Sequence, residues 1–381
     1  MKKLILLLLL FTTIAKVRGQ EAQNIADLDF LYQAIQKVPS YKDQLKSDKT
    51  YVQLYQQLRK ELNTTDELIV FQKLAQLIFP LRDNHLALAR KPDSNFKFIS
   101  LKPEVDLVRL EKKLIEVPLD SIEGVFYEGQ QKYLIYKQAP QVYYVQSIAD
   151  NEVKAILCKN QFSSYDVVQF KFGSYPYVLN RNIKFLNGLL IGLNYAKEPG
   201  KTYYDVVERK EKYSYKMLNE TTGYLSLGTF SSSNQNIEVA TRFFDQISPT
   251  ITTKNLIVDV RNNGGGGYKT SKQFLAFLDK FKGEVYVLQN AYTVSNAEQF
   301  ILKLREKRKI TTMGESTMGT ITYGSNYGKR ITLPSDRFTF YPTDMSGLKK
   351  ELVYESIGIK PDVYLNPFTE DWVAQALKQI K

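Results

Sequence analysis

The sequence is poor in the two side chains on which most metal and thiol chemistry depends. Its 381 residues include one cysteine, Cys158, and one histidine, His85. A single cysteine excludes an internal disulfide, and the apolar segment around Cys158 indicates a small buried side chain rather than a reactive thiol. A single histidine excludes a metal site built from several imidazoles, and the usual zinc-ligand spacings do not occur. We therefore expect no metal and no cofactor, and any reaction that needs an imidazole must use His85.

The sequence also lacks long apolar runs, with one exception at its start. Met1-Lys2-Lys3 precedes an uncharged apolar run from Leu4 to Ala15, and Gly19 follows shortly after it. This run is shorter than the ~20 residues that span a bilayer. The layout is that of a secretory signal peptide over residues 1–19, cut after Gly19. We therefore expect an exported protein, periplasmic or extracellular, with no integral membrane segment after signal removal.

Neither sign of charge is strongly concentrated in any one segment. The chain carries 52 Lys and Arg against 40 Asp and Glu, a formal charge of +12, and four of the basic residues lie in the signal segment. The mature chain, at +12 less these four, is moderately basic, which favours acidic surfaces and substrates through long-range attraction. No arginine-rich arm, zinc finger or other nucleic-acid-binding motif stands out. We expect no nucleic-acid partner.

The mature chain is longer than one core usually holds, and its periodicity divides it into three regions. Residues 20–95 carry apolar side chains at helical spacing, such as Leu28, Leu31 and Ile35, and predict a helical region. Residues 96–220 hold short runs rich in Tyr, Val and Ile that predict β-strands without fixing their topology. Residues 221–381 alternate strands with helices, which predicts βαβ crossovers and a largely parallel or mixed sheet. The predicted fold class is a multidomain α+β or α/β protein.

Two segments of the last region combine features of a catalytic site. Ser295 stands at the start of a predicted helix, where the helix dipole and free N–H groups can bind an oxyanion. Ser295 to Glu298 also spell a helix capping box, which taken alone is the better explanation of the serine. The segment from Asp259 to Gly265 places glycines directly after a buried strand, so its backbone can turn sharply and aim N–H groups into a cleft. A simple loop is the alternative for this second segment.

Together and in this order, these segments resemble the catalytic domain of the tail-specific (C-terminal-processing) and tricorn-core serine peptidases. That family reads Asp-x-Arg-x-Asn-x-Gly-Gly after a strand, then Thr-x-Ser-x-x-Glu, then Gly-x-x-Thr-x-Gly, and closes on Glu-x-x-Gly-(Val/Ile)-x-Pro-Asp. The counterparts in this chain are Asp259 to Gly265, Thr293 to Glu298, Gly314 to Gly319 and Glu355 to Asp362. The resemblance covers roughly residues 222–366. It implies a ClpP/crotonase-like catalytic domain, a serine-type peptidase activity and a protein or peptide substrate.

The resemblance also implies a nucleophile and a base. Ser295 matches the nucleophile. One branch of the family pairs it with a lysine directly after the third motif, where this chain has Thr320. The tricorn-type branch instead uses a histidine in an Asp-x-His segment, which here implies His85 as general base and Glu355 as the supporting glutamate. Asn84 stands where that branch has a second serine, and its amide can still hydrogen-bond or orient a partner.

Further site residues follow from the same resemblance. The N–H groups of Gly264 or Gly265 and of Asn296 are the implied oxyanion donors. Glu298 is expected to cap or brace the helix that begins at the nucleophile. Asp259 and Arg261 are expected to organise the glycine turn. A PDZ module, common in the lysine branch, is not supported, because its Gly-Asp-x-Ile-x-x-(Ile/Val)-(Asn/Asp)-Gly segment does not occur between residues 96 and 220.

Two other functions stay open at this stage. A binding protein on the same fold, with a decayed site, is favoured by Asn84 and by the missing lysine. The presence of Ser295, His85 and Glu355 at their motif positions argues against that function. A cysteine hydrolase that pairs Cys158 with His85 is the weaker alternative, because no motif or glycine turn surrounds the cysteine.

Overall fold

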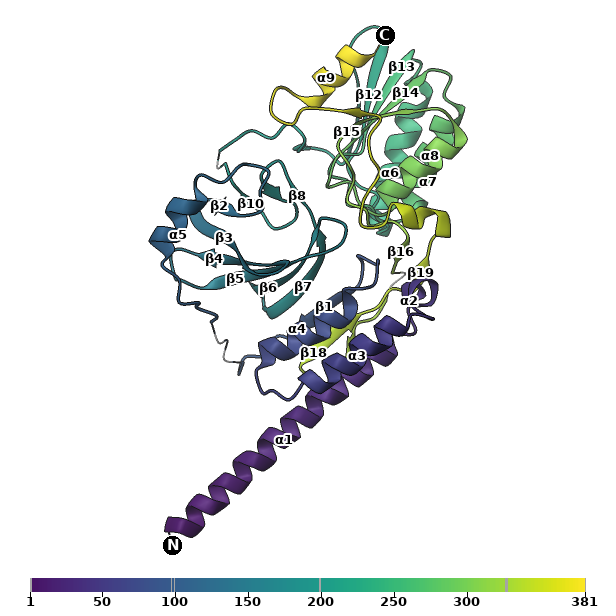
Figure 1. Cartoon of the computed structure of the whole chain (residues 1–381). Helices are drawn as coiled ribbons and strands as arrows, with labels where there is room; N and C mark the ends of the chain where they lie inside the picture. Colours follow the sequence, from purple (N-terminus) through teal and green to yellow (C-terminus); the bar gives the residue numbers. More distant parts are fainter. Residues whose placement is uncertain (1, 97, 99, 199, 326–327, 381) are drawn as a thin grey trace. The chain divides into compact units, whose positions relative to one another are not determined.

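The computed structural model describes residues 2–96, 98, 100–198, 200–325 and 328–380, with side chains in the first helix described from Gly19 on. It is a mixed α+β protein with a large sheet and helices (Figure 1). The chain forms two compact units. The first contains Met1–Ile183, Tyr195–Lys197 and Tyr323–Ser346, and the second contains Lys184–Asn194, Glu198–Thr322 and Gly347–Lys381. The three regions expected from the sequence are thus regrouped, and residues 323–346 fall in the first unit.

The first unit combines N-terminal helices with a long antiparallel sheet. Its helices are α1 (Lys2–Ile35), α2 (Pro39–Gln44), α3 (Lys49–Glu61), α4 (Glu67–Ile78) and α5 (Leu107–Leu114). Its strands are β1 (Ala87–Arg90), β2 (Gly124–Glu128), β3 (Gln131–Ala139), β4 (Val142–Ser147), β5 (Val153–Lys159), β6 (Tyr165–Phe172), β7 (Tyr175–Ile183), β10 (Tyr195–Ala196), β16 (Tyr323–Gly324), β17 (Ile331–Thr332), β18 (Phe338–Tyr341) and β19 (Met345–Ser346). The strand order is β17-β18-β1-β7-β6-β5-β4-β3-β2-β10, and β16 pairs with β19.

The predicted signal peptide, residues 1–19, falls on the first half of α1, and its side chains up to Arg18 lie outside the described part of the chain. Over the described residues, no helix has both the length and the apolar character needed to cross a bilayer. The later helices start where the sequence supplies caps: the Asp48 and Asp66 carboxylates accept N–H groups of α3 and α4. The segment from Gln20 to Ile78 is accordingly mostly helical, whereas Ala87–Arg90, which also lie in the region expected to be helical, form β1.

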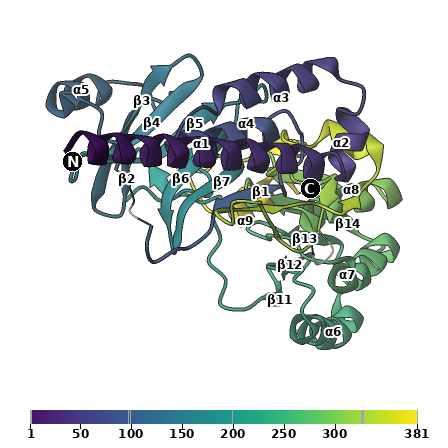
Figure 2. The same cartoon turned by 90° about the horizontal axis from the view of Figure 1, so that it is seen from below.

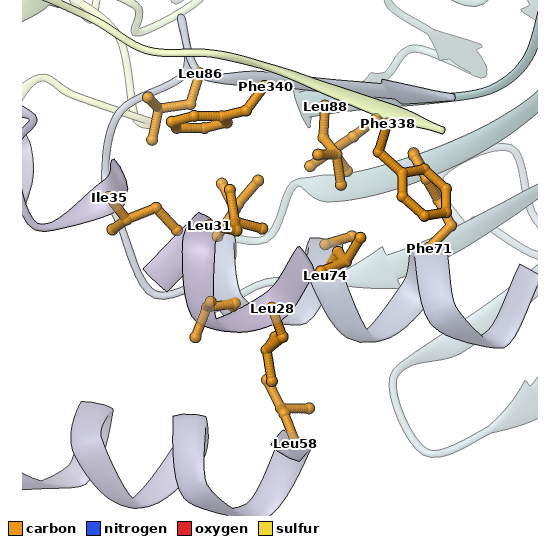
Figure 3. Close-up of a cluster of buried hydrophobic side chains, with 14 of the residues drawn as sticks. Leu28, Leu31, Ile35, Leu58, Phe71, Leu74, Leu86, Leu88, Phe338 and Phe340 are labelled. Atoms are coloured by element: carbon orange, nitrogen blue, oxygen red, sulfur yellow. The ribbon is translucent and has the colours of Figure 1, made fainter. Parts of the chain in front are cut away.

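The core of the first unit joins residues from distant parts of the sequence. Leu28 and Leu31 of α1, Phe71 of α4 and Phe338 and Phe340 of β18 lie in one buried cluster (Figure 3). The strand β18 reaches this cluster because it pairs antiparallel with β1, with Leu88 opposite Phe340. Residues 323–346, which follow the nucleophile motif in the sequence, thus complete the core of the N-terminal unit.

The second unit is built on a mixed six-stranded sheet. The strands of that sheet are β11 (Tyr213–Met217), β12 (Thr222–Leu227), β13 (Asn255–Asp259), β14 (Glu284–Gln289), β15 (Thr311–Gly314) and β20 (Val363–Tyr364). The unit also contains β8 (Phe185–Leu186) and β9 (Leu189–Leu190), which pair with each other outside that sheet. Its helices are α6 (Asn234–Ile247), α7 (Tyr268–Lys280), α8 (Asn296–Lys307), α9 (Trp372–Gln379) and the short η1 (Ser248–Thr250) and η2 (Lys349–Val353). The order is β11-β12-β13-β14-β15-β20, in which β11 alone pairs antiparallel to its neighbour among the described residues.

Helices cover both faces of this second sheet (Figures 1 and 2). Leu256 and Val258 of β13 pack with α6, α7 and α8, whereas Ile257 packs with Trp372 of α9 on the other face. Alternate residues of one strand point to opposite faces, so a strand covered on both sides must be apolar throughout. The predicted strands and helices of residues 221–314 are confirmed, and α8 begins directly after Ser295.

Candidate active site

The glycine turn starts from a buried ion pair at the end of β13. Asp259 and Arg261 are both fully buried and lie 2.7 Å apart, carboxylate oxygen to guanidinium nitrogen. Arg209 forms a second ion pair with Asp259 at 3.1 Å, and the Tyr224 hydroxyl donates to the same carboxylate at 2.7 Å. Burial raises the pKa of the Asp259 carboxyl, but the two arginines outweigh it, and the pKa lies below its ordinary value. Asp259 and Arg261 therefore act as a charged anchor from which the turn departs.

Asn263 connects this turn to its neighbours on both sides. Its side-chain amide donates to the Leu227 carbonyl at 2.8 Å, and its side-chain oxygen accepts the Gly265 N–H at 2.9 Å. Its backbone carbonyl accepts the Val294 N–H at 3.0 Å. The glycine turn is thus bonded both to the end of β12 and to the residue that precedes Ser295.

Glycine is required where the turn approaches the serine. Gly265 has a φ of +83°, and a Cβ there would lie 2.6 Å from the Val294 carbonyl oxygen and 2.9 Å from the Ser295 Cβ. Distances under 3 Å leave no room for a side chain, so Gly265 brings its backbone against Ser295 because it has none. The two segments that the sequence motifs identified are therefore in direct contact.

Ser295 has an unusual backbone conformation for a residue at a helix start. Its φ is +58° and its ψ −120°, in a region that residues with a Cβ rarely adopt. Its N–H donates to the Glu298 carboxylate at 2.8 Å, one half of the expected capping box. The strained backbone at the start of α8 goes beyond what capping alone requires, and such strain gathers at functional sites.

Two buried glutamates hold the segment that follows β15. The Glu298 carboxylate accepts the N–H groups of Gly319 and Thr320 at 2.7 and 3.0 Å, as well as the Thr317 hydroxyl. The Glu355 carboxylate, also fully buried, accepts the next two N–H groups along the chain, each at 2.8 Å. Burial raises the pKa of Glu298, and its hydrogen-bond donors work against that rise. Glu298 thus bonds to Ser295 at one end and to the Gly314–Gly319 motif at the other.

The implied oxyanion donors differ in their surroundings. The Asn263 side chain accepts the Gly265 N–H, whereas Gly264 is exposed and a Cβ added to it would meet no atom within 4 Å. Asn296 is the first residue of α8, and first-turn N–H groups have no acceptor within their own helix. A Cβ on Gly265 would lie 3.0 Å from the Asn296 nitrogen. Of the donors that the resemblance implies, the Gly265 N–H is thus already bonded within its own turn, to the Asn263 side chain.

His85 and Asn84 lie in the first unit, in the turn between α4 and β1, so the expected pair with Ser295 is divided between the two units. The buried Asp83 carboxylate accepts the backbone N–H of His85 at 3.3 Å and the Thr343 hydroxyl at 2.6 Å. Burial lowers the pKa of the His85 imidazole, and the Asp83 charge opposes this. Its Nδ1 is buried and has no hydrogen-bond partner within the described part of the chain. A neutral imidazole is the form that acts as a base.

Sequence reasoning missed three buried titratable residues of the second unit. Lys184 is only 8% exposed and donates to the carbonyl oxygens of Thr317 and Ile357 at 2.6 and 2.7 Å. Burial lowers the pKa of its ammonium group to about 8. Glu315 and Asp205 are also buried. Glu315 occupies a variable position of the third motif, and no pattern marks the other two, so the sequence holds no signal for them.

The surroundings of Cys158 and the grouping of possible metal-ligating side chains bear on two other kinds of site. Burial raises the pKa of the Cys158 thiol to about 11, which disfavours the thiolate that a cysteine hydrolase would need. Within the described residues, no group of three or more His, Cys, Asp or Glu side chains is placed to hold a metal ion.

Comparisons with known proteins give no family-model match and no match among curated proteins. Solved structures similar to this chain include a photosystem II D1 C-terminal processing protease, at 14% identity and a TM-score of 0.41 over 90% of this chain and 93% of that one. Mature CPAF has 13% identity and a TM-score of 0.45 over 92% and 93%. The tricorn protease has 10% identity and a TM-score of 0.43 over 94% and 36%. The likeness of this chain to these structures is a distant one.

Proposed function

We propose that this chain is an exported serine endopeptidase, active in the periplasm or outside the cell on proteins or peptides, with Ser295 as its nucleophile. The second unit is then its ClpP/crotonase-like catalytic domain. The observation that carries the proposal is the backbone of Ser295, which has a φ of +58° at the start of α8 and lies against Gly265, a position that admits no side chain. A strained serine beside free backbone N–H groups is the arrangement that acyl transfer needs.

In the proposed mechanism, His85 takes the proton of the Ser295 hydroxyl as the oxygen attacks the carbonyl carbon of the scissile peptide. The N–H groups of Gly264 and Asn296 stabilise the oxyanion of the tetrahedral intermediate, a contribution of about 3 kcal/mol per donor. His85 then gives the proton to the leaving amine. Water, deprotonated by the same imidazole, hydrolyses the acyl-enzyme and frees Ser295. Glu355 and Glu298 keep the residues around the nucleophile in place. The Asn84 amide orients a hydrogen-bonded group next to His85.

The test compares residues 20–381 of the wild type with Ser295→Ala and His85→Ala on an unfolded protein substrate. Circular dichroism and thermal melting first establish that all three are folded. We expect no cleavage by Ser295→Ala and a loss of at least about 100-fold in His85→Ala, the usual contribution of a general base. Full activity in His85→Ala would contradict the base assignment and direct attention to Lys184, the buried lysine of the second unit, to be tested as Lys184→Met. A folded wild type without any cleavage would favour a binding protein on the same fold.

A further inference from the structure

Asp205 and Glu315 form a pair of buried carboxyl groups outside the catalytic residues named above. They are 2% and 9% exposed, their side chains lie within hydrogen-bonding reach of each other, and the buried Asp205 Oδ1 has no donor among the described residues. Two ionised carboxylates have only acceptor atoms, so a hydrogen bond between them requires a proton on one of the two. Two like charges in a shared buried site also disfavour ionisation of both groups. A single proton held by the pair is therefore the state that this buried contact favours.

The pair is attached to the turn that leads from β14 to Ser295. The Glu315 carboxylate accepts the Ala291 N–H at 3.1 Å, and the Glu315 backbone N–H donates to the Gln289 carbonyl at 3.3 Å. The Asp205 carbonyl oxygen accepts the Asn290 side-chain amide at 2.9 Å. Three consecutive residues of the chain, 289 to 291, are thus bonded to one or the other member of the pair.

The same turn is connected onward to the glycine turn. The Asn290 side-chain oxygen accepts the Asn262 N–H at 2.9 Å, and the Thr293 hydroxyl donates to the Val260 carbonyl at 2.9 Å. A displacement of residues 290 and 291 would therefore shift both the turn that ends at Ser295 and the neighbouring segment that carries Gly264.

Few charged groups face the pair. The positive charge of Lys184 lowers the pKa of Glu315, and that of Arg261 lowers the pKa of Asp205. The negative charge of Asp205 raises the pKa of Tyr203 and of Tyr292. The Asn187 amide donates to Glu315 at 3.4 Å. Burial, and after it the charge of Asp205, raises the pKa of Glu315 to about 7, and burial raises the pKa of Asp205. Because these folded-state values lie above the ordinary ones, the stability they confer is present in acid and lost as the pH rises through about 7.

We infer that Asp205 and Glu315 share one proton and act as positioning residues that hold the turn bearing Ser295, and that loss of this proton loosens the turn. The inference deepens the proposed peptidase function and rests on it for its catalytic consequence. The loss brings two negative charges into contact, and the hydrogen bond between the side chains disappears. The expected result is a nucleophile that becomes less well placed in alkaline solution, in addition to any titration of the base.

Glu315→Gln tests this inference, because an amide resembles the protonated carboxyl. Its oxygen can accept the Ala291 N–H, its NH2 group can donate to Asp205, and it does not ionise near neutral pH. Asp205→Asn makes the same replacement from the other side, in case the first variant does not fold. Glu238→Gln, at an exposed position of α6, is the matched control for the loss of one carboxylate.

The main measurement is amide hydrogen exchange in peptides covering residues 288–296, at about pH 6 and about pH 8.5, values on either side of the pKa of Glu315. We expect similar exchange in all proteins at the lower pH. At the higher pH we expect wild type and Glu238→Gln to exchange about threefold or more faster than Glu315→Gln in these peptides. Equal exchange in wild type and Glu315→Gln at both pH values would overturn the inference, whether or not the protein is a peptidase.

Labelling of Ser295 by a fluorophosphonate gives the catalytic readout. The ratio of labelling rates, Glu315→Gln over wild type, cancels the titration of the base and is expected to rise by about threefold or more between the two pH values. A flat ratio together with altered exchange would overturn the link to the nucleophile. Absence of labelling at any pH, with exchange behaving as expected, would reject the proposed function and leave the role of the pair in holding the turn supported.

Discussion

At the scale of single residues, Ser295 differs from the other polar residues that begin helices in this chain. Asp66 and Ser233 have φ values of −73° and −63° and extended backbones, and their side chains accept helix N–H groups. Ser295 has a φ of +58°. A non-glycine residue in such a region costs about 1–3 kcal/mol, which the surrounding structure must supply. Here the Glu298 carboxylate and the glycine turn keep it in place.

This strain predicts different stabilities for two inactive variants. Ser295→Ala and Ser295→Gly both remove the hydroxyl group, but only glycine also relieves the positive φ. We expect Ser295→Gly to be more stable than Ser295→Ala by about 1 kcal/mol in free energy of unfolding, measured by urea denaturation with unchanged m-values. An alanine variant as stable as the glycine variant would mean that the backbone of Ser295 is not strained.

The sequence predicted the residues that belong to motifs and missed those that do not. Ser295, Glu298 and Glu355 could be named because their spacing from glycines and strands is regular. Asp205 and Lys184 could not, because each lies in an irregular segment and becomes buried through contacts with residues far along the chain. Patterns along a sequence report the local backbone, and such long-range contacts leave no trace in them.

At the scale of elements, the sequence indicated a glycine-rich turn after β13 but did not distinguish its glycines. The structure does. Gly266 has a φ of +136°, and a Cβ there would lie 1.9 Å from the Phe230 carbonyl oxygen, whereas a Cβ on Gly264 would have open space. Gly266 permits the backbone contact with residue 230, whereas Gly264 is exposed.

Alanine substitutions at two glycines of this turn should therefore differ in their effect on stability. Gly266→Ala is expected to lower the free energy of unfolding by about 2 kcal/mol or more, through strain and the clash with Phe230. Gly264→Ala is expected to change it by less than about 0.5 kcal/mol, because the new methyl group meets no atom. Thermal melting of the two variants measures these losses of stability. An equal loss of stability in Gly266→Ala and Gly264→Ala would show that the turn is not arranged as described.

At the scale of the whole molecule, the chain returns to its first unit after the nucleophile motif. The sequence placed residues 323–346 with the catalytic region, because they lie between its third motif and its closing motif. In the structure, β18 pairs with β1, and Phe338 and Phe340 fill the core of the first unit (Figure 3). A pairing across some 250 residues is determined by tertiary packing, which local periodicity does not report.

This arrangement predicts that a residue close to the catalytic motifs in sequence stabilises the N-terminal unit. Phe338→Ala should cost about 3–5 kcal/mol, as expected for a fully buried phenylalanine. Val108→Ala, at a position of α5 that is 67% exposed, should change stability by less than about 0.5 kcal/mol. Urea denaturation of residues 20–381 measures both, and hydrogen exchange should show the loss first in α1, α4 and β1. A loss confined to β12–β15 would contradict the assignment.

The central claim is that Ser295 is an activated nucleophile. The most direct measurement treats folded residues 20–381 with a fluorophosphonate at neutral pH and locates the adduct by mass spectrometry. We predict a single adduct on Ser295, absent from Ser295→Ala and formed at least about 100-fold more slowly in His85→Ala. An adduct on another serine, or none on the folded wild type, would contradict the account.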